Sequence, residues 1–186
     1  MTDMTDTDSI VLRPFERGDF VRLMSWIRSP EFLIQWAGPQ FEYPLDESQL
    51  EAYFQDSQGE KPSRMIYKVV DTCDEVIGHI ELNKIDLQNG SGTISRVLVD
   101  PHHQGKGVCA RMLRQLLAVA FQQLRLHRVD LFVFDFNLNA IRCYERVGFV
   151  KEGLLRDVRK VGNTYWSGHF MSILSHEWDS RRNITR

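Results

Sequence analysis

The segment from Val97 to Ala110 constrains the fold more than any other part of this 186-residue chain. It begins as an apolar strand, turns at Pro101, continues through a loop that holds Gly105 and Gly107, and ends in the first turn of a helix. Glycine lets a backbone approach a ligand closely, and the first turn of a helix presents unpaired N–H groups. The segment therefore predicts an anion site that can hold a phosphate group.

The order of the predicted elements around this loop indicates an α+β fold. Runs of β-forming residues before the loop are separated by turn residues such as Asn89-Gly90, which is typical of antiparallel strands. The strands before and after the central helix enclose a βαβ unit and should run parallel. The predicted strands cover residues 9–13, 64–70, 76–85, 93–99, 127–134, 149–155 and 164–174, and the predicted helices cover 16–27, 46–55, 105–124 and 137–147. We expect one mixed, mostly antiparallel sheet of about seven strands flanked by about four helices.

The segment between the first two predicted helices is rich in aromatic residues. Ser29-Pro30 is expected to end the helix over 16–27, because proline is unfavourable inside a helix. The following loop from Trp36 to Pro39 could line a pocket, although core packing is an equally simple explanation for clustered aromatic side chains.

The composition argues against several classes of protein. The formal net charge of −2 gives no indication of nucleic-acid binding, and no apolar run is long enough to span a membrane. Three cysteines are an odd count for a disulfide framework, and no histidine pairs with a cysteine at the spacing of a metal site. The first residues lack the apolar stretch of a secretory signal. We expect a cytoplasmic, metal-free protein with a disordered tail over 1–8, a single domain over 9–178 and a polar tail over 179–186.

Other phosphate-binding folds also place glycines between a strand and a helix. The Rossmann fingerprint needs a G-x-G-x-x-G run early in a parallel sheet, whereas antiparallel strands come first here. The P-loop needs G-x-x-x-x-G-K followed by Ser or Thr, and this run is absent. A phosphate loop within an α+β sheet remains.

Two motifs resemble those of the GNAT superfamily of acyl-CoA-dependent N-acyltransferases. Gln104-Gly105-Lys106-Gly107, after a Val-x-Pro strand end, resembles the pyrophosphate loop of that family, and the run from Asn137 to Phe149 is similar to its second cofactor segment. Leu12-Arg13-Pro14-Phe15 near the start and Ser172-Ile173-Leu174 near the end resemble the branch of ribosomal-protein N-terminal acetyltransferases and spermidine acetyltransferases. The resemblance covers nearly the whole chain.

The resemblance implies that acetyl-CoA binds between two splayed parallel strands, 93–99 and 127–134. The N–H groups at the start of the helix would hold the pyrophosphate, and strand backbone groups would bind the pantetheine arm. Asn137 could contact this arm, cap a helix, or do both. The implied cofactor-binding residues are Val97, Leu98, Val99, Gln104, Gly105, Lys106, Gly107, Val108, Cys109, Asn137 and Asn139.

The resemblance also implies a catalytic role for Tyr144, which matches the general acid of the family and would protonate the departing thiolate. Its position alone favours a packed tyrosine in an amphipathic helix, and the catalytic role comes from the resemblance. Related proteins often carry a glutamate base at the position of Ile94, which cannot act as a base. Glu81 is the nearest substitute for this base, and the alternative is that Glu81 is a solvent-facing strand residue. Strand alternation predicts that Arg96 shares a face with Ile94. Arg96 would then favour an acceptor with a carboxylate or phosphate, or else would pair with an acidic residue such as Glu81.

The sequence thus predicts an acetyl-CoA-dependent N-acetyltransferase that transfers the acetyl group directly to a primary amine through a ternary complex. The acceptor could be a protein N-terminus or a small molecule such as an amino acid, a polyamine or an aminoglycoside, and Trp36 and Tyr43 are expected to form its wall. A non-catalytic acyl-CoA sensor is the alternative from another functional class. Dimers are common in the family, so a homodimer is a further expectation.

Overall fold

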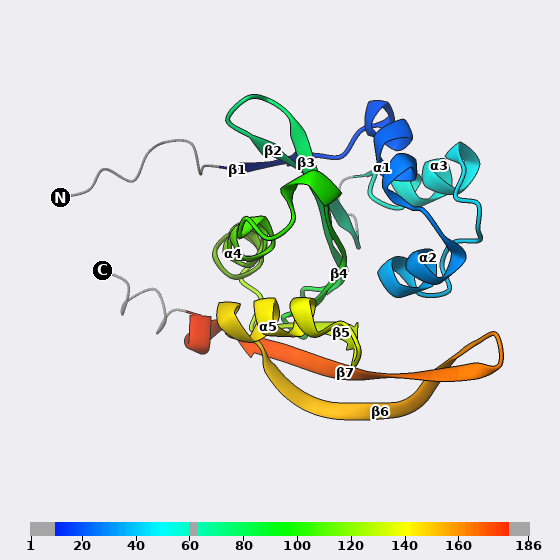
Figure 1. Ribbon diagram of the computed structural model, residues 1–186. Helices are drawn as coiled ribbons and strands as arrows, with labels where there is room; N and C mark the ends of the chain where they lie inside the picture. The colour runs from blue at the N-terminus through cyan, green and yellow to red at the C-terminus, as the bar shows by residue number, and fades with distance from the viewer. Residues whose placement is uncertain (1–9, 60–62, 179–186) are drawn as a thin grey trace.

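The computed structural model describes residues 10–59 and 63–178, and the two predicted tails lie outside these residues. Its centre is one seven-stranded sheet in the order β1-β2-β3-β4-β5-β7-β6 (Figure 1). The strands are β1 Ile10–Pro14, β2 Met65–Asp71, β3 Val76–Asp86, β4 Ser91–Val99, β5 Arg128–Phe134, β6 Val150–Val161 and β7 Thr164–Leu174. Only β4 and β5 pair in parallel, and every other neighbouring pair is antiparallel. The predicted α+β fold with a mixed sheet is confirmed.

Helices cover the sheet in two groups, which Figure 1 shows on either side of β2–β4. The first group is α1 Phe20–Trp26, α2 Pro30–Ala37 and α3 Glu47–Gln55, and the second is α4 Val108–Ala118 and α5 Leu138–Val147. Each group buries its own apolar cluster: Leu33 and Leu50 belong to the first, and Met112 and Leu116 belong to the second. No helix among the described residues is long and apolar enough to cross a membrane.

Strands β4 and β5 pair only at one end. Their ladder joins residues 91–94 to residues 128–131 and then stops. Beyond Ile94, β4 carries one extra residue relative to β3, because Glu81 pairs with Ser95 while His79 pairs with Leu98. Arg96 sits within this bulge with a φ of 50°, in the left-handed region. The two strands therefore separate beyond their short ladder, as the family resemblance implied.

The last hairpin is longer than predicted, because β6 continues past residue 155 to Val161, and two boundaries near the cavity also differ from the predictions. The first helix does end before Ser29-Pro30, at Trp26, but these residues also begin α2: the Ser29 side chain accepts the N–H of Phe32 at 3.1 Å, and Pro30 occupies the first helical position. The predicted helix over 105–124 begins only at Val108, since Gly105 and Gly107 have φ near 75°, which no α-helix accommodates. Beyond Ala118 the backbone continues as one π-helical segment, Val119–Gln123.

Candidate active site

A cavity of about 590 Å³ opens where β4 and β5 separate. The two strands form its walls, the loop before α4 closes one end, and α5 and α2 complete it. The lining residues are Phe32, Gln35 and Trp36 from α2; 94–99 from β4; His103, Gln104, Gly105 and Gly107 from the loop; Val108, Cys109 and Ala110 from α4; 131–134 from β5; and Asn137, Asn139, Ala140, Cys143, Tyr144 and Arg146 from the α5 region. Ten of the eleven predicted cofactor-binding residues are among them, and Lys106 is not.

The loop before α4 is shaped by two glycines with left-handed backbone. Gly107 is the N-cap of α4 and supplies no side chain to satisfy the first N–H groups of that helix. A side chain added at Gly105 or Gly107 would meet no atom within 4 Å, so open space lies in front of both. The Gln104 amide donates to the Val99 carbonyl at 3.2 Å and ties the loop to the end of β4. These free N–H groups and the positive end of the helix dipole suit an anion.

Tyr144 reaches the cavity from the middle of α5. Asn137 caps this helix by accepting the N–H of Ala140 at 3.4 Å, and Gly148 ends it. The Tyr144 side chain is largely buried, and its hydroxyl makes no hydrogen bond with the described residues. Burial raises the pKa of Tyr144 well above its usual value, with smaller contributions from the neighbouring thiols. The phenol is therefore protonated at neutral pH, as a proton donor must be.

Arg96 lies on the opposite face of the sheet from Ile94, so the prediction that they share a face is wrong. Ile94 packs in the cluster under α4, whereas the Arg96 guanidinium lies over the rings of Phe41 and Tyr53, at 5.7 and 5.3 Å. Strand alternation assumes an unbroken strand, and the bulge at Arg96 reverses the side on which the side chain emerges.

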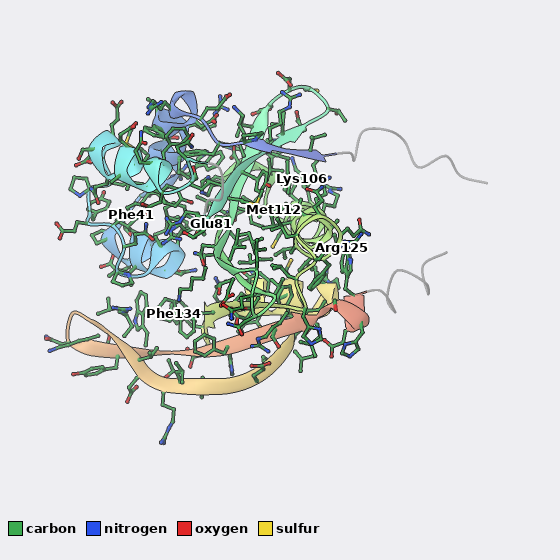
Figure 2. All side chains as sticks on the ribbon, turned by 180° about the vertical axis from the view of Figure 1, so that it is seen from behind. Phe41, Glu81, Lys106, Met112, Arg125 and Phe134 are labelled. Carbon is green, nitrogen blue, oxygen red and sulfur yellow. The ribbon has the colours of Figure 1, made fainter. Side chains whose placement is uncertain are left out.

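Glu81 is held inside a buried polar network rather than at the cavity surface. It is completely buried and does not line the cavity, so the solvent-facing interpretation is wrong. Its carboxylate pairs with Arg96 and accepts the Tyr53 hydroxyl at 2.6 Å, and Arg96 also donates to Gln40. Figure 2 shows Glu81 between Phe41 and Met112, inside the molecule. Of the alternatives for Arg96, the structure contains the ion pair with Glu81.

The two residues expected to form the acceptor wall are in different surroundings. Trp36 lines the cavity together with Phe32 and Gln35, which sequence reasoning missed because α2 was interpreted as a loop. The helical spacing of these three residues, at positions 32, 35 and 36, was the available signal. Tyr43 is 47% exposed and does not line the cavity.

One group of side chains has the composition of a metal site. Asp71, Glu75 and His103 place ligand atoms within 4.8 Å of one another. Asp71 Oδ1 already accepts the N–H groups of Cys73 and Glu75 at 2.9 Å, which closes the turn between β2 and β3. Turn closure therefore accounts for the position of Asp71 without a metal.

Comparisons with known proteins agree with this geometry. The acetyltransferase (GNAT) family matches residues 30–149. The chain is 28% identical to a spermidine N(1)-acetyltransferase of Vibrio cholerae over 173 residues, covering 92% of this chain and 96% of that protein. It is 30% identical to a putative ribosomal N-acetyltransferase of Bacillus subtilis over 105 residues, 56% of this chain and 57% of that protein.

A solved structure shows the same arrangement of elements. The spermidine N-acetyltransferase of Vibrio cholerae in complex with CoA and spermine superposes with a TM-score of 0.80, at 26% identity, over 91% of this chain and 97% of that one. The family match, the fold and the anion loop at the start of α4 lead to one assignment: the chain belongs to the GNAT acetyltransferase family and is an acetyl-CoA-dependent N-acetyltransferase.

Proposed function

We propose that this enzyme transfers the acetyl group directly from acetyl-CoA to a primary amine that enters from the α2 side. The observation that carries the proposal is the cavity between β4 and β5, since it joins the anion loop, Tyr144 and the α2 side chains Phe32 and Trp36 in one space. Donor and acceptor can then meet without a covalent enzyme intermediate. We assign the pyrophosphate to the N–H groups from Gly105 to Cys109 and the pantetheine arm to the backbone of Val97–Val99.

Tyr144 supplies the proton in the proposed reaction. The neutral amine nitrogen bonds to the thioester carbonyl carbon, the carbon–sulfur bond breaks, and the departing sulfur takes the Tyr144 hydroxyl proton. The new amide nitrogen sheds its extra proton to water in the cavity, and the tyrosinate regains one from solvent. We do not assign Glu81 as the base, because its carboxylate is buried under Arg96 and away from the cavity.

We propose an acceptor with one amine rather than a polyamine. None of the described residues that line the cavity is Asp or Glu, so nothing there attracts a second positive charge. The Arg96 charge is balanced by Glu81, so it does not select an anionic acceptor strongly either. A protein N-terminus or a small monoamine fits these surroundings, next to the apolar side chains of Phe32 and Trp36. The spermidine acetyltransferases among the relatives make polyamines the first alternative.

An acceptor panel tests the proposal. CoA release is followed with a thiol reagent for spermidine, spermine, an aminoglycoside, small monoamines and short peptides with a free N-terminus, each with acetyl-CoA. We expect turnover with a monoamine or peptide and a Tyr144→Phe variant whose kcat falls about 10²-fold or more while acetyl-CoA affinity stays unchanged. Preferred turnover of spermidine would overturn the acceptor assignment. Tight acetyl-CoA binding without acetylation of any amine would instead favour the sensor function.

We also propose that the enzyme forms a homodimer and is located in the cytoplasm. A homodimer could form through β6, which is one of the two edge strands of the sheet and exposes Val150, Leu154, Leu155 and Val158. Light scattering at several concentrations would show twice the monomer mass if β6 pairs two copies.

A cytoplasmic location rests on the odd cysteine count and the free thiols, which suit a reducing compartment.

A further inference from the structure

Two of the three cysteines meet at the cavity, although 34 positions separate them in the sequence. Cys109 lies in the first turn of α4 and Cys143 lies in α5, and their Sγ atoms are 2.9 Å apart. Both thiols are free, and both line the cavity. The third cysteine, Cys73, is exposed in the turn between β2 and β3.

The two sulfurs have different chemical environments. The hydrogen bond between the two thiols lowers the pKa of Cys143, and the positive charges of Arg146 and Arg114 lower it further, against an opposing effect of burial. The same hydrogen bond and burial raise the pKa of Cys109. A thiolate is the reactive form of cysteine, so Cys143 is the nucleophile of the pair and Cys109 is placed to react second.

We propose that Cys109 and Cys143 form a redox-sensitive dithiol site that a peroxide converts to a disulfide, and that acetyl-CoA in the cavity protects it. The Cys143 thiolate attacks one oxygen of hydrogen peroxide, the O–O bond breaks, and a sulfenic acid and hydroxide form. The Cys109 sulfur then attacks the Cys143 sulfur, the S–O bond breaks, and hydroxide leaves. The thiol protons convert both hydroxides to water. Two thiols are thus oxidised by two electrons, and one peroxide is reduced to two waters.

The position of the pair connects its oxidation to the cofactor. A disulfide has an S–S length of about 2.05 Å, so the sulfurs must approach by roughly 0.9 Å, and this draws α4 and α5 together. Cys109 belongs to the turn assigned to the pyrophosphate, and Cys143 precedes Tyr144. Oxidation should therefore weaken acetyl-CoA binding, and by linkage acetyl-CoA should slow oxidation. This protective effect rests on the proposed function, whereas disulfide formation does not.

The test counts thiols in the whole protein after treatment with hydrogen peroxide, without any acceptor amine. Free thiols in the denatured protein should fall from three to one, and the intact mass should drop by two hydrogen atoms. The matched control Cys73→Ser should still form the bond and fall from two thiols to none. Cys109→Ser and Cys143→Ser should form no intramolecular disulfide. A peptide map should link the two cavity cysteines.

The outcomes separate the two parts of the proposal. Oxygen addition without a link, or a disulfide that involves Cys73, would overturn the dithiol site. Acetyl-CoA, which has no free thiol, should slow the loss of thiols in the wild-type protein at least severalfold. If the disulfide forms at the same rate with and without acetyl-CoA, the protective role is wrong, and the assignment of the pyrophosphate loop is in question while the dithiol site stands.

Discussion

His79 is a buried neutral histidine, and its titration should make the protein less stable below neutral pH. It lies in β3 with 2% of its surface exposed. Tyr53 donates its only hydroxyl hydrogen to Glu81, so the 3.0 Å contact between Tyr53 Oη and His79 Nε2 requires the imidazole to donate. Nδ1 has no hydrogen-bond partner in the described residues. Burial, with a further effect of the Arg96 charge, lowers the pKa of His79 to about 3.

The lowered pKa of His79 determines the direction and the size of the change in folding stability with pH. The pKa of His79 in the folded protein lies below its unfolded value of about 6.5. The stability that the neutral imidazole contributes is therefore fully present above pH 6.5. As the pH falls, the unfolded chain binds a proton that the folded protein does not, and each pH unit costs about 1.4 kcal/mol. Between pH 7 and pH 5 the loss is about 2 kcal/mol. The loss continues until the pH reaches the folded pKa of about 3.

Urea denaturation of wild-type protein and a His79→Gln variant at pH 7 and pH 5 measures this contribution. Glutamine keeps an N–H donor for Tyr53 Oη but does not titrate. We expect the free energy of unfolding of the wild type to fall by about 2 kcal/mol more than that of the variant over this range. A His102→Gln control, at an exposed histidine, should retain the full loss. Equal losses in wild-type and His79→Gln protein would refute the assignment of a neutral buried imidazole.

Three further predictions concern the loop, a helix cap and the core. Gly107→Asp should weaken acetyl-CoA binding in calorimetry about a hundredfold or more, because like charges about 4 Å apart repel by about 4 kcal/mol, whereas Gly18→Asp should leave the affinity unchanged. Ser29→Ala should lower the free energy of unfolding by about 1 kcal/mol in urea titrations, because α2 loses its N-cap; no change would argue against the cap. Leu116→Ala should cost about 2–5 kcal/mol, and the exposed Leu87→Ala about 0.5 kcal/mol or less; similar losses would contradict the core assignment.

The geometry of the loop and helices proposed to bind the donor could be predicted from the sequence, because short-range rules determine it. Gly105 and Gly107 are needed where the backbone takes a left-handed conformation, and the apolar spacing after them places α4. Asn137 caps α5 as predicted and thereby sets the position of Tyr144 along the helix. Each of these inferences uses residues within a few positions of one another, and the strands around them follow from alternation and turns.

The residues proposed to face the acceptor could not be predicted in the same way. Ser29-Pro30 is compatible both with the end of one helix and with the start of the next, since serine caps and proline opens a helix. That ambiguity hid α2 and, with it, Phe32 and Gln35. The pair of Arg96 with Glu81 was one of two alternatives that the sequence left open, whereas the contact of Arg96 with Gln40, in a distant segment, follows no local pattern.

The bulge in β4 connects these two parts of the site. Pairing with β5 ends at Ile94, immediately before the bulge, so the backbone of Val97–Val99 has no partner strand on that side and is available to a ligand arm. The same extra residue turns Arg96 toward α3, where Glu81 balances its charge. One backbone irregularity therefore both leaves strand backbone free for the proposed donor and pairs the Arg96 charge next to the proposed acceptor site. A substitution among the residues that pair across the bulge would therefore change the charge at that end of the cavity without changing the anion loop.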